Sequence, residues 1–129
     1  MARILVVDDQ QELRSLLRDL LVQAGHTVLE AAGPHEAMVI AACEQPDVAL
    51  IDYDLGARLH GVALLGRVRE LSGRTRRVLM SGGAVPGLEA HTRTGLVQHF
   101  VAKPCTLRDL LAAVSTQSST TAEALALGL

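Results

Sequence analysis

Apolar and polar residues follow one another along the chain with two different periods. Short, nearly continuous apolar runs indicate buried strands, and longer segments with apolar residues three and four positions apart indicate amphipathic helices. The predicted strands are RILVV (3–7), TVLEA (27–31), DVALID (47–52), RRVLMS (76–81) and VQHFVAK (97–103). The predicted helices follow each strand in turn, at 10–25, 34–45, 61–72, 85–95 and 105–115.

Local signals limit several of these helices. Gly25 is typical of the residue just beyond a helix end, and Thr106 followed by Asp109 has the spacing of a capping box. The fourth helix contains Pro86 and Gly87, so we expect it to be short. In the first helix one apolar stripe is formed by Leu13, Leu16, Leu17, Leu20 and Leu21.

Strict alternation of strands and helices predicts the α/β class. Right-handed crossovers place helices on both faces of a parallel sheet. We therefore expect a doubly wound, five-stranded parallel sheet of the flavodoxin-like order 2-1-3-4-5. This domain would occupy residues 1–114. Residues 115–129, rich in hydroxyl and then small apolar side chains, are predicted to be a linker or C-terminal extension, disordered or helical.

Composition narrows the class of function. With 129 residues, 49% hydrophobic and 20% charged, the chain is long and apolar enough for one domain that folds without metal or disulfide staples. A net charge of -2 and 2% aromatic residues argue against direct nucleic-acid binding. The chain has no membrane-length apolar run, and Cys43 and Cys105 are far apart. A cytoplasmic protein without membrane contact is expected.

Polar residues stand at the ends of four predicted strands: Asp8 and Asp9, then Asp52, Ser81 and Lys103. The carboxyl ends of parallel strands meet at one edge of a sheet, so these side chains should lie together. Two carboxylates roughly 4 Å apart repel by about 4 kcal/mol at an effective dielectric constant near 20. Lys103 and a divalent cation would compensate this repulsion, and carboxylate oxygens suit Mg²⁺. Because a carboxylate can itself attack a phosphoryl group, Asp52 is the candidate nucleophile.

Four short motifs, VVDD, LIDYDL, LMSG and FVAKP, occur in this order along the chain. In order and approximate spacing they resemble the receiver domains of bacterial two-component response regulators, over residues 3 to about 114. The resemblance implies that Asp52 is the phosphoacceptor and that Asp8 and Asp9 hold Mg²⁺ with Asp52. It also implies that the backbone carbonyl of Asp54 completes the metal shell.

The resemblance extends to a conformational switch. By it, Ser81 bonds one phosphoryl oxygen, Lys103 pairs with another, and the Lys103–Pro104 peptide is cis. Phe100 matches an aromatic switch position, and it would turn inward as Ser81 moves toward the phosphoryl group. This would change the face made by residues 85–95, 97–103 and 105–115, through which a homodimer could also form.

The resemblance also implies the partners. A histidine kinase or histidine phosphotransferase would supply the phosphoryl group, and a downstream protein or an output domain outside this chain would read the switch. The protein would not be an enzyme beyond its own phosphorylation and slow dephosphorylation. It departs from the pattern at Gly56, where many members have a proline, and in a loop before Gly61 that is one residue longer. Asp54 adds a fourth acid near the site.

Three other interpretations remain open. The acids could serve as helix caps, as Asp9 could for the first helix, although capping does not explain Asp8, Asp52 and Lys103 together. A haloacid-dehalogenase-type phosphatase would use Asp52 as nucleophile and Asp54 as general acid. A flavodoxin-like binder is disfavoured because no hydroxyl-rich phosphate loop follows the first strand.

One further cluster of charge stands outside this site. The run GRTRRV holds three arginines just before and within the fourth predicted strand. It is interpreted as a solvated basic loop rather than as a phosphate or nucleic-acid patch. The residues concerned are Arg74, Arg76 and Arg77.

Overall fold

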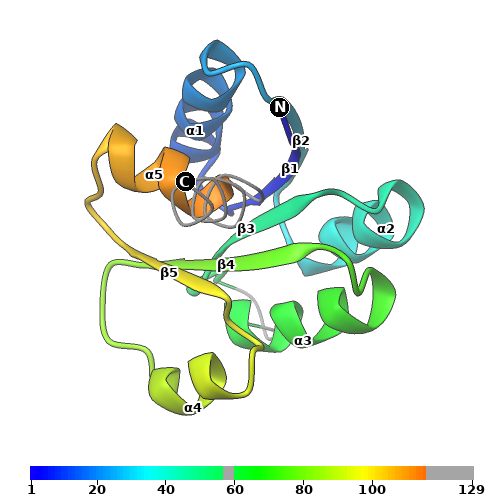
Figure 1. Cartoon of the computed structure of the whole chain (residues 1–129), viewed down its shortest axis with the longest axis vertical. Coiled ribbons are helices and arrows are strands. Elements are labelled where there is room, and N and C mark those ends of the chain that lie inside the picture. The colour runs from blue at the N-terminus through cyan, green and yellow to red at the C-terminus, as the bar shows by residue number, and fades with distance from the viewer. Residues whose placement is uncertain (57–59, 116–129) are drawn as a thin grey trace, which may run out of the picture.

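The structure is a computed structural model that describes residues 1–56 and 60–115. Strands and helices alternate along this part of the chain (Figure 1). The strands are β1 (Arg3–Val7), β2 (Thr27–Ala31), β3 (Val48–Asp52), β4 (Arg76–Ser81) and β5 (His99–Ala102). The helices are α1 (Gln11–Gln23), α2 (Pro34–Glu44), α3 (Gly61–Leu71), α4 (Leu88–Arg93) and α5 (Leu107–Val114).

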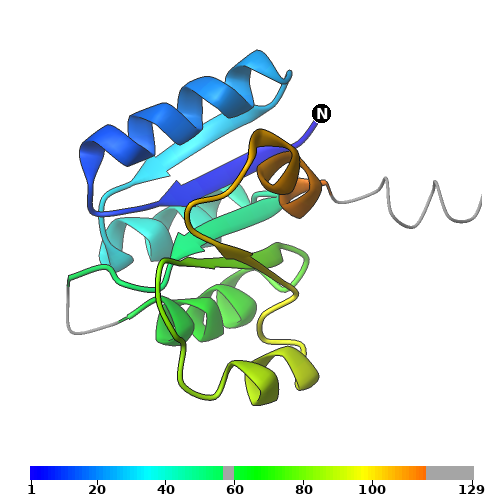
Figure 2. The same ribbon diagram turned by 90° about the vertical axis from the view of Figure 1, so that its left-hand side faces the viewer.

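The five strands form one sheet in the order β2-β1-β3-β4-β5, and every neighbouring pair is parallel. This confirms the predicted fold class and strand order. In the register, Val7 lies opposite Ala31 on one side and Ile51 on the other, while Asp52 lies opposite Met80. The side view shows the strand ends meeting at a common edge, where the chain leaves β1 and β3 (Figure 2).

Helices cover both faces of the sheet because alternate strand residues point to opposite sides. Ile4 and Val6 of β1 pack beneath α1 and α5, in a cluster that includes Leu21 and Leu110. Leu5 and Val7 point to the other face, where α2 and α3 contribute apolar residues and the segment around α4 adds Val85, Leu88 and Val97. Two apolar layers therefore hold the sheet rigidly between the helices.

Several predicted boundaries are confirmed and others shift. Gly25, with φ of 98°, follows the C-cap of α1, and Thr106 and Asp109 form the capping box of α5. The fourth helix is short, as expected. β5 begins at His99, later than predicted. Leu16 lies on the apolar stripe of α1 as predicted, lining the same face as Leu13, Leu17 and Leu20, but its side chain is 53% exposed.

The interpretation of the arginine run as a solvated basic loop was wrong for Arg77, which lies within β4. Its side chain is buried, and its guanidinium donates to the backbone carbonyls of Leu96 and Gly95 at 2.9 and 2.8 Å and of Thr75 at 3.3 Å. Arg74 is exposed but pairs with Asp47. The partners of these arginines come mostly from segments distant along the chain. The local charge pattern therefore could not predict which arginine is buried and which is exposed.

Two sequence predictions fall partly or wholly outside the described residues. The longer loop before Gly61 includes residues 57–59, and the C-terminal extension comprises residues 115–129, of which residue 115 alone is described. Within the described ranges, the helices are all too short or too polar to cross a lipid bilayer.

Candidate functional site

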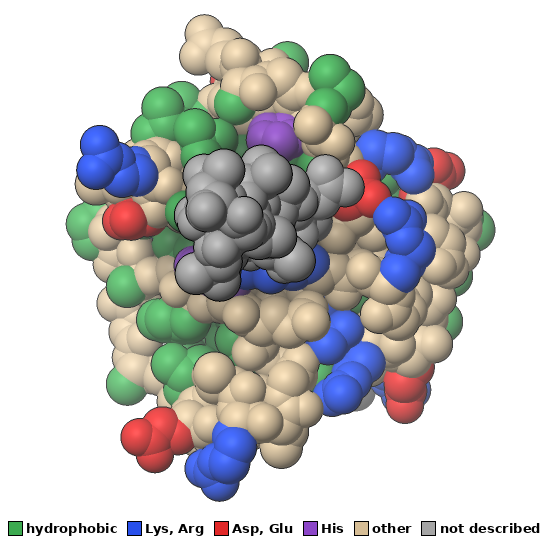
Figure 3. All heavy atoms as spheres, in the orientation of Figure 1, with side chains coloured by type: hydrophobic (Ala, Val, Ile, Leu, Met, Phe, Trp, Pro, Cys, Tyr) green, Lys and Arg blue, Asp and Glu red, His purple; other side chains and the backbone are tan. Residues whose placement is uncertain are grey.

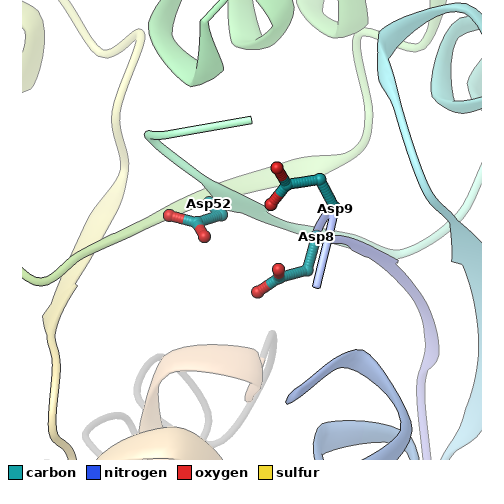
Figure 4. Close-up of side chains that lie close together, drawn as sticks. All are labelled: Asp8, Asp9 and Asp52. Carbon is teal, nitrogen blue, oxygen red and sulfur yellow. The ribbon is translucent and has the colours of Figure 1, made fainter. Parts of the chain in front are cut away.

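Three carboxylates gather at the carboxyl-terminal edge of the sheet. Asp8 and Asp9 directly follow β1, and Asp52 is the last residue of β3. One carboxylate oxygen from each lies within 4.8 Å of the others. Figure 4 shows the three side chains side by side where the two strands end. The parallel sheet thus brings together acids that are more than forty residues apart in sequence, as the strand-end rule predicted.

Lys103, the residue after β5, supplies the compensating cation. Its ammonium donates to Asp52 Oδ2 at 2.8 Å and lies 3.8 Å from Asp8 Oδ2. The backbone N–H of Lys103 donates to the Ser81 carbonyl at 2.9 Å, which extends the pairing of β4 and β5 to this residue. The Lys103–Pro104 peptide is cis, as the resemblance implied. One ammonium faces three carboxylates here, so the negative charge is not fully balanced.

Asp8 is completely buried, and its carboxylate is only half satisfied. Oδ1 accepts from the N–H of Gln10 at 2.8 Å, whereas Oδ2 has no hydrogen-bond partner among the described residues. Burial raises the pKa of Asp8, and the charges of Asp52 and Asp9 raise it further, against the lowering effects of the Gln10 N–H and Lys103. A buried carboxylate oxygen without a donor is what a bound cation would satisfy.

Asp52 is held from two sides. Its Oδ2 takes the Lys103 hydrogen bond, and its Oδ1 accepts from the N–H of Asp54 at 3.2 Å. The carboxylate is mostly buried, with a residue exposure of 5%, yet it lines a cleft of about 430 Å³. The cleft is lined by Asp9, Gln10, Asp52, Tyr53, Asp54, Ser81, Gly82, Gly83, Ala84 and Lys103. A reagent entering this cleft would therefore meet Asp52 with its oxygens already oriented.

Glycines shape the approach to Asp52. A Cβ on Gly61 would lie 2.7 Å from Tyr53 Cα, so α3 can begin against the backbone after Asp52 only at a residue without a side chain. Gly61 also donates its N–H to the Tyr53 carbonyl at 2.8 Å. Gly56 adopts a φ of 64°, which the proline expected at this position could not. Gly56 therefore allows a backbone conformation here that proline would not.

The remaining predicted residues take different places. Ser81, at the end of β4, lines the cleft, and its hydroxyl is engaged with Gly83, donating to the carbonyl at 3.0 Å and accepting from the N–H at 3.1 Å. Asp54 is exposed and its Oδ1 accepts from Gly56 N–H, so its side chain is turned into the loop. Phe100 is partly buried against the core on the α2 and α3 face.

A second depression lies on the other side of Lys103, between α1 and α5. It is an apolar groove of about 430 Å³, and in Figure 3 hydrophobic side chains are visible between these two helices. Leu16 and Leu107, 53% and 50% exposed, form part of its wall. Lys103 lines both the groove and the acidic cleft. Sequence reasoning missed this groove, because the exposure of Leu16 and Leu107 depends on how α1 and α5 pack and leaves no mark in the local pattern.

The chain resembles known proteins over almost all of the described fold. The family model for the response regulator receiver domain matches residues 4–115. Sporulation initiation phosphotransferase F of Bacillus subtilis (strain 168) is 29% identical over 113 residues, which cover 87% of this chain and 90% of that protein. Chemotaxis protein CheY of the same organism is 24% identical over 88% of this chain and 94% of its own length.

Longer proteins also match, through a fraction of their length. The chain spans 15% of the sensory/regulatory protein RpfC of Xanthomonas campestris pv. campestris (strain ATCC 33913), at 32% identity over 84% of this chain. Among solved structures, a CheY-like receiver domain protein from Methanospirillum hungatei JF-1 superposes with a TM-score of 0.83 at 24% identity, covering 95% and 98% of the two chains. A Burkholderia pseudomallei response regulator gives a TM-score of 0.80 at 25% identity, over 99% of this chain and 75% of that one.

Proposed function

The chain belongs to the response regulator receiver domain family, whose members are phosphorelay phosphoacceptors, and we propose that Asp52 is the residue that receives the phosphoryl group. The observation that carries this proposal is the position of its carboxylate, 2.8 Å from Lys103 Nζ and within a cluster of three acids. Asp52 combines this charge environment with access from the cleft, whereas Asp8 is completely buried.

Asp8, Asp9 and Asp52 are proposed to hold Mg²⁺, with the backbone carbonyl of Asp54 as a further ligand. The donor set consists of hard oxygen ligands, and the unpartnered Oδ2 of Asp8 fits a cation. The similar Burkholderia pseudomallei response regulator contains a phosphorylated aspartic acid and a calcium ion, which supports a divalent cation beside the acceptor. Such a cation neutralises charge between the acids and the phosphoryl oxygens.

The reaction proposed is transfer of a phosphoryl group from a phosphohistidine. A carboxylate oxygen of Asp52 attacks phosphorus, the P–N bond breaks, and the histidine nitrogen keeps the bonding electron pair. Lys103 would move from the carboxylate toward a phosphoryl oxygen, while the Asp54 N–H orients the remaining carboxylate oxygen. The product is an acyl phosphate that carries nearly two negative charges where there was one.

Ser81 and Phe100 are proposed as the switch residues. To bond a phosphoryl oxygen, the Ser81 hydroxyl must break its hydrogen bonds to Gly83. The loop between β4 and α4 would then change conformation. Phe100, on β5, lies opposite Leu79 of β4, the strand that leads into this loop. Each tenfold change in the active population requires about 1.4 kcal/mol of differential stabilisation. The face made by α4, β5 and α5 is the proposed output and dimerisation surface.

Receiver domains take part in exchange with histidine kinases or phosphotransferases. We propose that the donor protein docks in the apolar groove between α1 and α5, because Lys103 connects that groove to the acidic cleft. Leu16→Ser and Leu107→Ser should slow transfer from a cognate kinase but leave labelling by a small phosphodonor unchanged. Val39→Ser on α2, where Val39 is 50% exposed, is the matched control. Equal slowing by Val39→Ser would contradict this docking site.

Neither the fold nor these relatives support the haloacid-dehalogenase-type alternative. We further propose that the protein is not an enzyme beyond its own phosphoryl chemistry and that it acts in the cytoplasm. Residues 1–114 would form the receiver domain, and residues 115–129 a C-terminal extension or linker. Capture with the phosphorylated protein would identify the downstream target or output domain.

The central test is labelling by a small phosphodonor such as phosphoramidate in the presence of Mg²⁺, read by intact mass. Asp52→Asn should abolish labelling completely. Asp54→Asn is the matched control, because it removes a carboxylate two residues away and should keep the label. Undiminished labelling of Asp52→Asn would reject the assignment. Hydrolysis of a generic phosphate monoester that Asp54→Asn abolishes would instead favour the phosphatase.

A further inference from the structure

The main chain of Asp8 is fixed on both sides. Its N–H donates to the carbonyl of Ala31 at 3.2 Å, which continues the pairing of β1 with β2. Its carbonyl accepts from Nη1 of Arg14 at 2.6 Å. The side chain therefore projects from a backbone held by one strand and one helix, with Oδ2 turned toward Lys103 and Asp52.

Arg14 is itself held in place. It lies in the first turns of α1, its side chain is 13% exposed, and its Nε donates to Glu30 Oε1 at 3.2 Å. The second oxygen of Glu30, on β2, accepts from Arg18 one turn further along α1, at 3.1 Å. Glu30 thus joins two arginines, and Arg14 is the one of the two that donates to the Asp8 carbonyl.

We infer that Arg14 is a positioning residue for the cation site, acting by fixing the Asp8 carbonyl so that the unpartnered carboxylate oxygen stays turned toward Asp52. This inference rests on the proposed role of Asp8 as a Mg²⁺ ligand. Arg14 would act through the Asp8 backbone and not as a ligand. Groups that orient ligands in this way affect metal affinity by about 10- to 100-fold when they are removed.

Charge and geometry predict opposite effects at this position. A guanidinium close to a cation site repels the incoming cation, so removal of its charge alone should tighten Mg²⁺ binding. Loss of the bond to the Asp8 carbonyl should weaken binding, because the carboxylate is then free to turn away. The sign of the change in affinity therefore separates a positioning role from a purely electrostatic one.

The experiment is a Mg²⁺ titration followed by the fluorescence of Tyr53, the single tyrosine of a chain that has no tryptophan. Tyr53 is adjacent to Asp52 in the cleft. Arg14→Met should weaken Mg²⁺ binding by roughly tenfold. Arg18→Met removes the same charge and the other half of the Glu30 contact, and it should leave the affinity within about twofold of wild type. Unchanged or tighter binding by Arg14→Met would overturn the inference.

Arg14→Lys gives a second measurement that does not depend on a change of charge. An ammonium can reach the Asp8 carbonyl or Glu30 but not both, so binding should be weaker than in wild type although the charge is kept. Wild-type affinity in Arg14→Lys would also contradict the inference. Circular dichroism with and without urea checks that each variant is folded.

Failure of this inference can be told apart from failure of the proposed function. A wild-type protein without a saturable response to Mg²⁺ would contradict the metal site itself. A saturable response in wild type that Arg14→Met leaves unchanged would contradict the positioning role alone. In labelling assays Arg14→Met should need more Mg²⁺ for half-maximal rate but reach the same plateau, a separation that simple destabilisation would not produce.

Discussion

The two edges of the sheet differ in whether their buried polar groups have hydrogen-bond partners. At the carboxyl-terminal edge, three acids face one ammonium, and Asp8 Oδ2 is buried without a hydrogen bond among the described residues. At the amino-terminal edge, which faces the viewer in Figure 3, the Arg77 guanidinium donates to three carbonyls. There the buried Thr75 hydroxyl also donates to the carbonyl of Pro46 at 2.6 Å.

This difference in hydrogen bonding distinguishes polar groups that stabilise the fold from polar groups that a ligand would satisfy. Buried polar atoms in folded proteins are almost always satisfied, and an exception calls for an explanation. The amino-terminal edge follows this rule within the protein itself. The carboxyl-terminal edge breaks this rule at Asp8, whose Oδ2 a bound cation would satisfy. The unbalanced negative charge at this edge therefore serves function at the expense of stability.

The largest effect on stability is expected at Arg77. Arg77→Met should lower the free energy of unfolding by about 3 kcal/mol, because the carbonyls of Thr75, Gly95 and Leu96 lose a donor that is buried in the fold. Urea denaturation measures this loss, while labelling of Asp52 should persist. Arg69→Met is the control, since exposed Arg69 bonds the nearby Thr94 carbonyl at 3.5 Å. Equal denaturation midpoints for Arg77→Met and wild type would contradict the claim that buried polar groups at the amino-terminal edge stabilise the fold.

Asp47, also at the amino-terminal edge, should show a pH-dependent effect. The N–H of Arg3, at 2.8 Å, and the guanidinium of Arg74 lower the pKa of Asp47 below its ordinary value of 3.8. A lowered pKa means that the carboxylate stabilises the fold above pH 3.8 and that this stability is lost as the pH falls through the folded-state pKa. Asp47→Asn should cost about 1.5 kcal/mol at neutral pH.

The pH series supplies the control for Asp47. The difference between wild type and Asp47→Asn in urea denaturation should hold from neutral pH to about 4 and shrink as the pH falls below 3.8. A difference that stays constant below pH 3.8 would mean that the charge of Asp47 contributes nothing.

A change of opposite sign is expected at Asp8. In the absence of Mg²⁺, Asp8→Asn should raise the free energy of unfolding by about 1 kcal/mol, because burial and the neighbouring acids disfavour its charged form. Added Mg²⁺ should stabilise wild type but not the variant, since a ligand that binds the folded state stabilises it. Thermal unfolding with and without Mg²⁺ measures both effects. Destabilisation by Asp8→Asn without Mg²⁺ would contradict the proposed difference between the edges.

The smallest effect is expected for an exposed ion pair at the amino-terminal edge. Arg3 and Glu44 are paired at 2.6 Å, but both side chains are more than 40% exposed. Glu44→Gln should change the free energy of unfolding by about 0.5 kcal/mol or less. A loss in urea denaturation as large as that of Arg77→Met would show that charge pairing, rather than burial, distinguishes this edge.

Much of the fold could be predicted from the sequence because each element carries a local signal. Short apolar runs and helical spacing set the five pairs of elements, and the parallel-sheet rule then brought Asp8, Asp52 and Lys103 to one edge. The capping box at Thr106 and the glycine after α1 were likewise local. The roles of Asp54, Ser81 and Phe100 rest on resemblance and stay predictions.

Other features had no local signal. Leu16 matches the helical stripe, yet it is exposed because α5 leaves a groove beside it instead of covering it. Arg77 belongs to a basic run, yet the loop between α4 and β5 folds over it. Arg14 is one of two arginines in α1, and nothing in its neighbourhood along the chain marks it as the one that bonds the Asp8 carbonyl.

The sequence by itself determined the order of the elements, the strand ends and therefore the composition of the acidic site, since periodicity and strand-end position are properties of neighbouring residues. The tertiary structure alone decided which long side chains reach which carbonyls and which oxygen of Asp8 is left without a donor. The physical reason is that these contacts join segments distant along the chain, and their geometry depends on how helices pack on the sheet, to within an ångström.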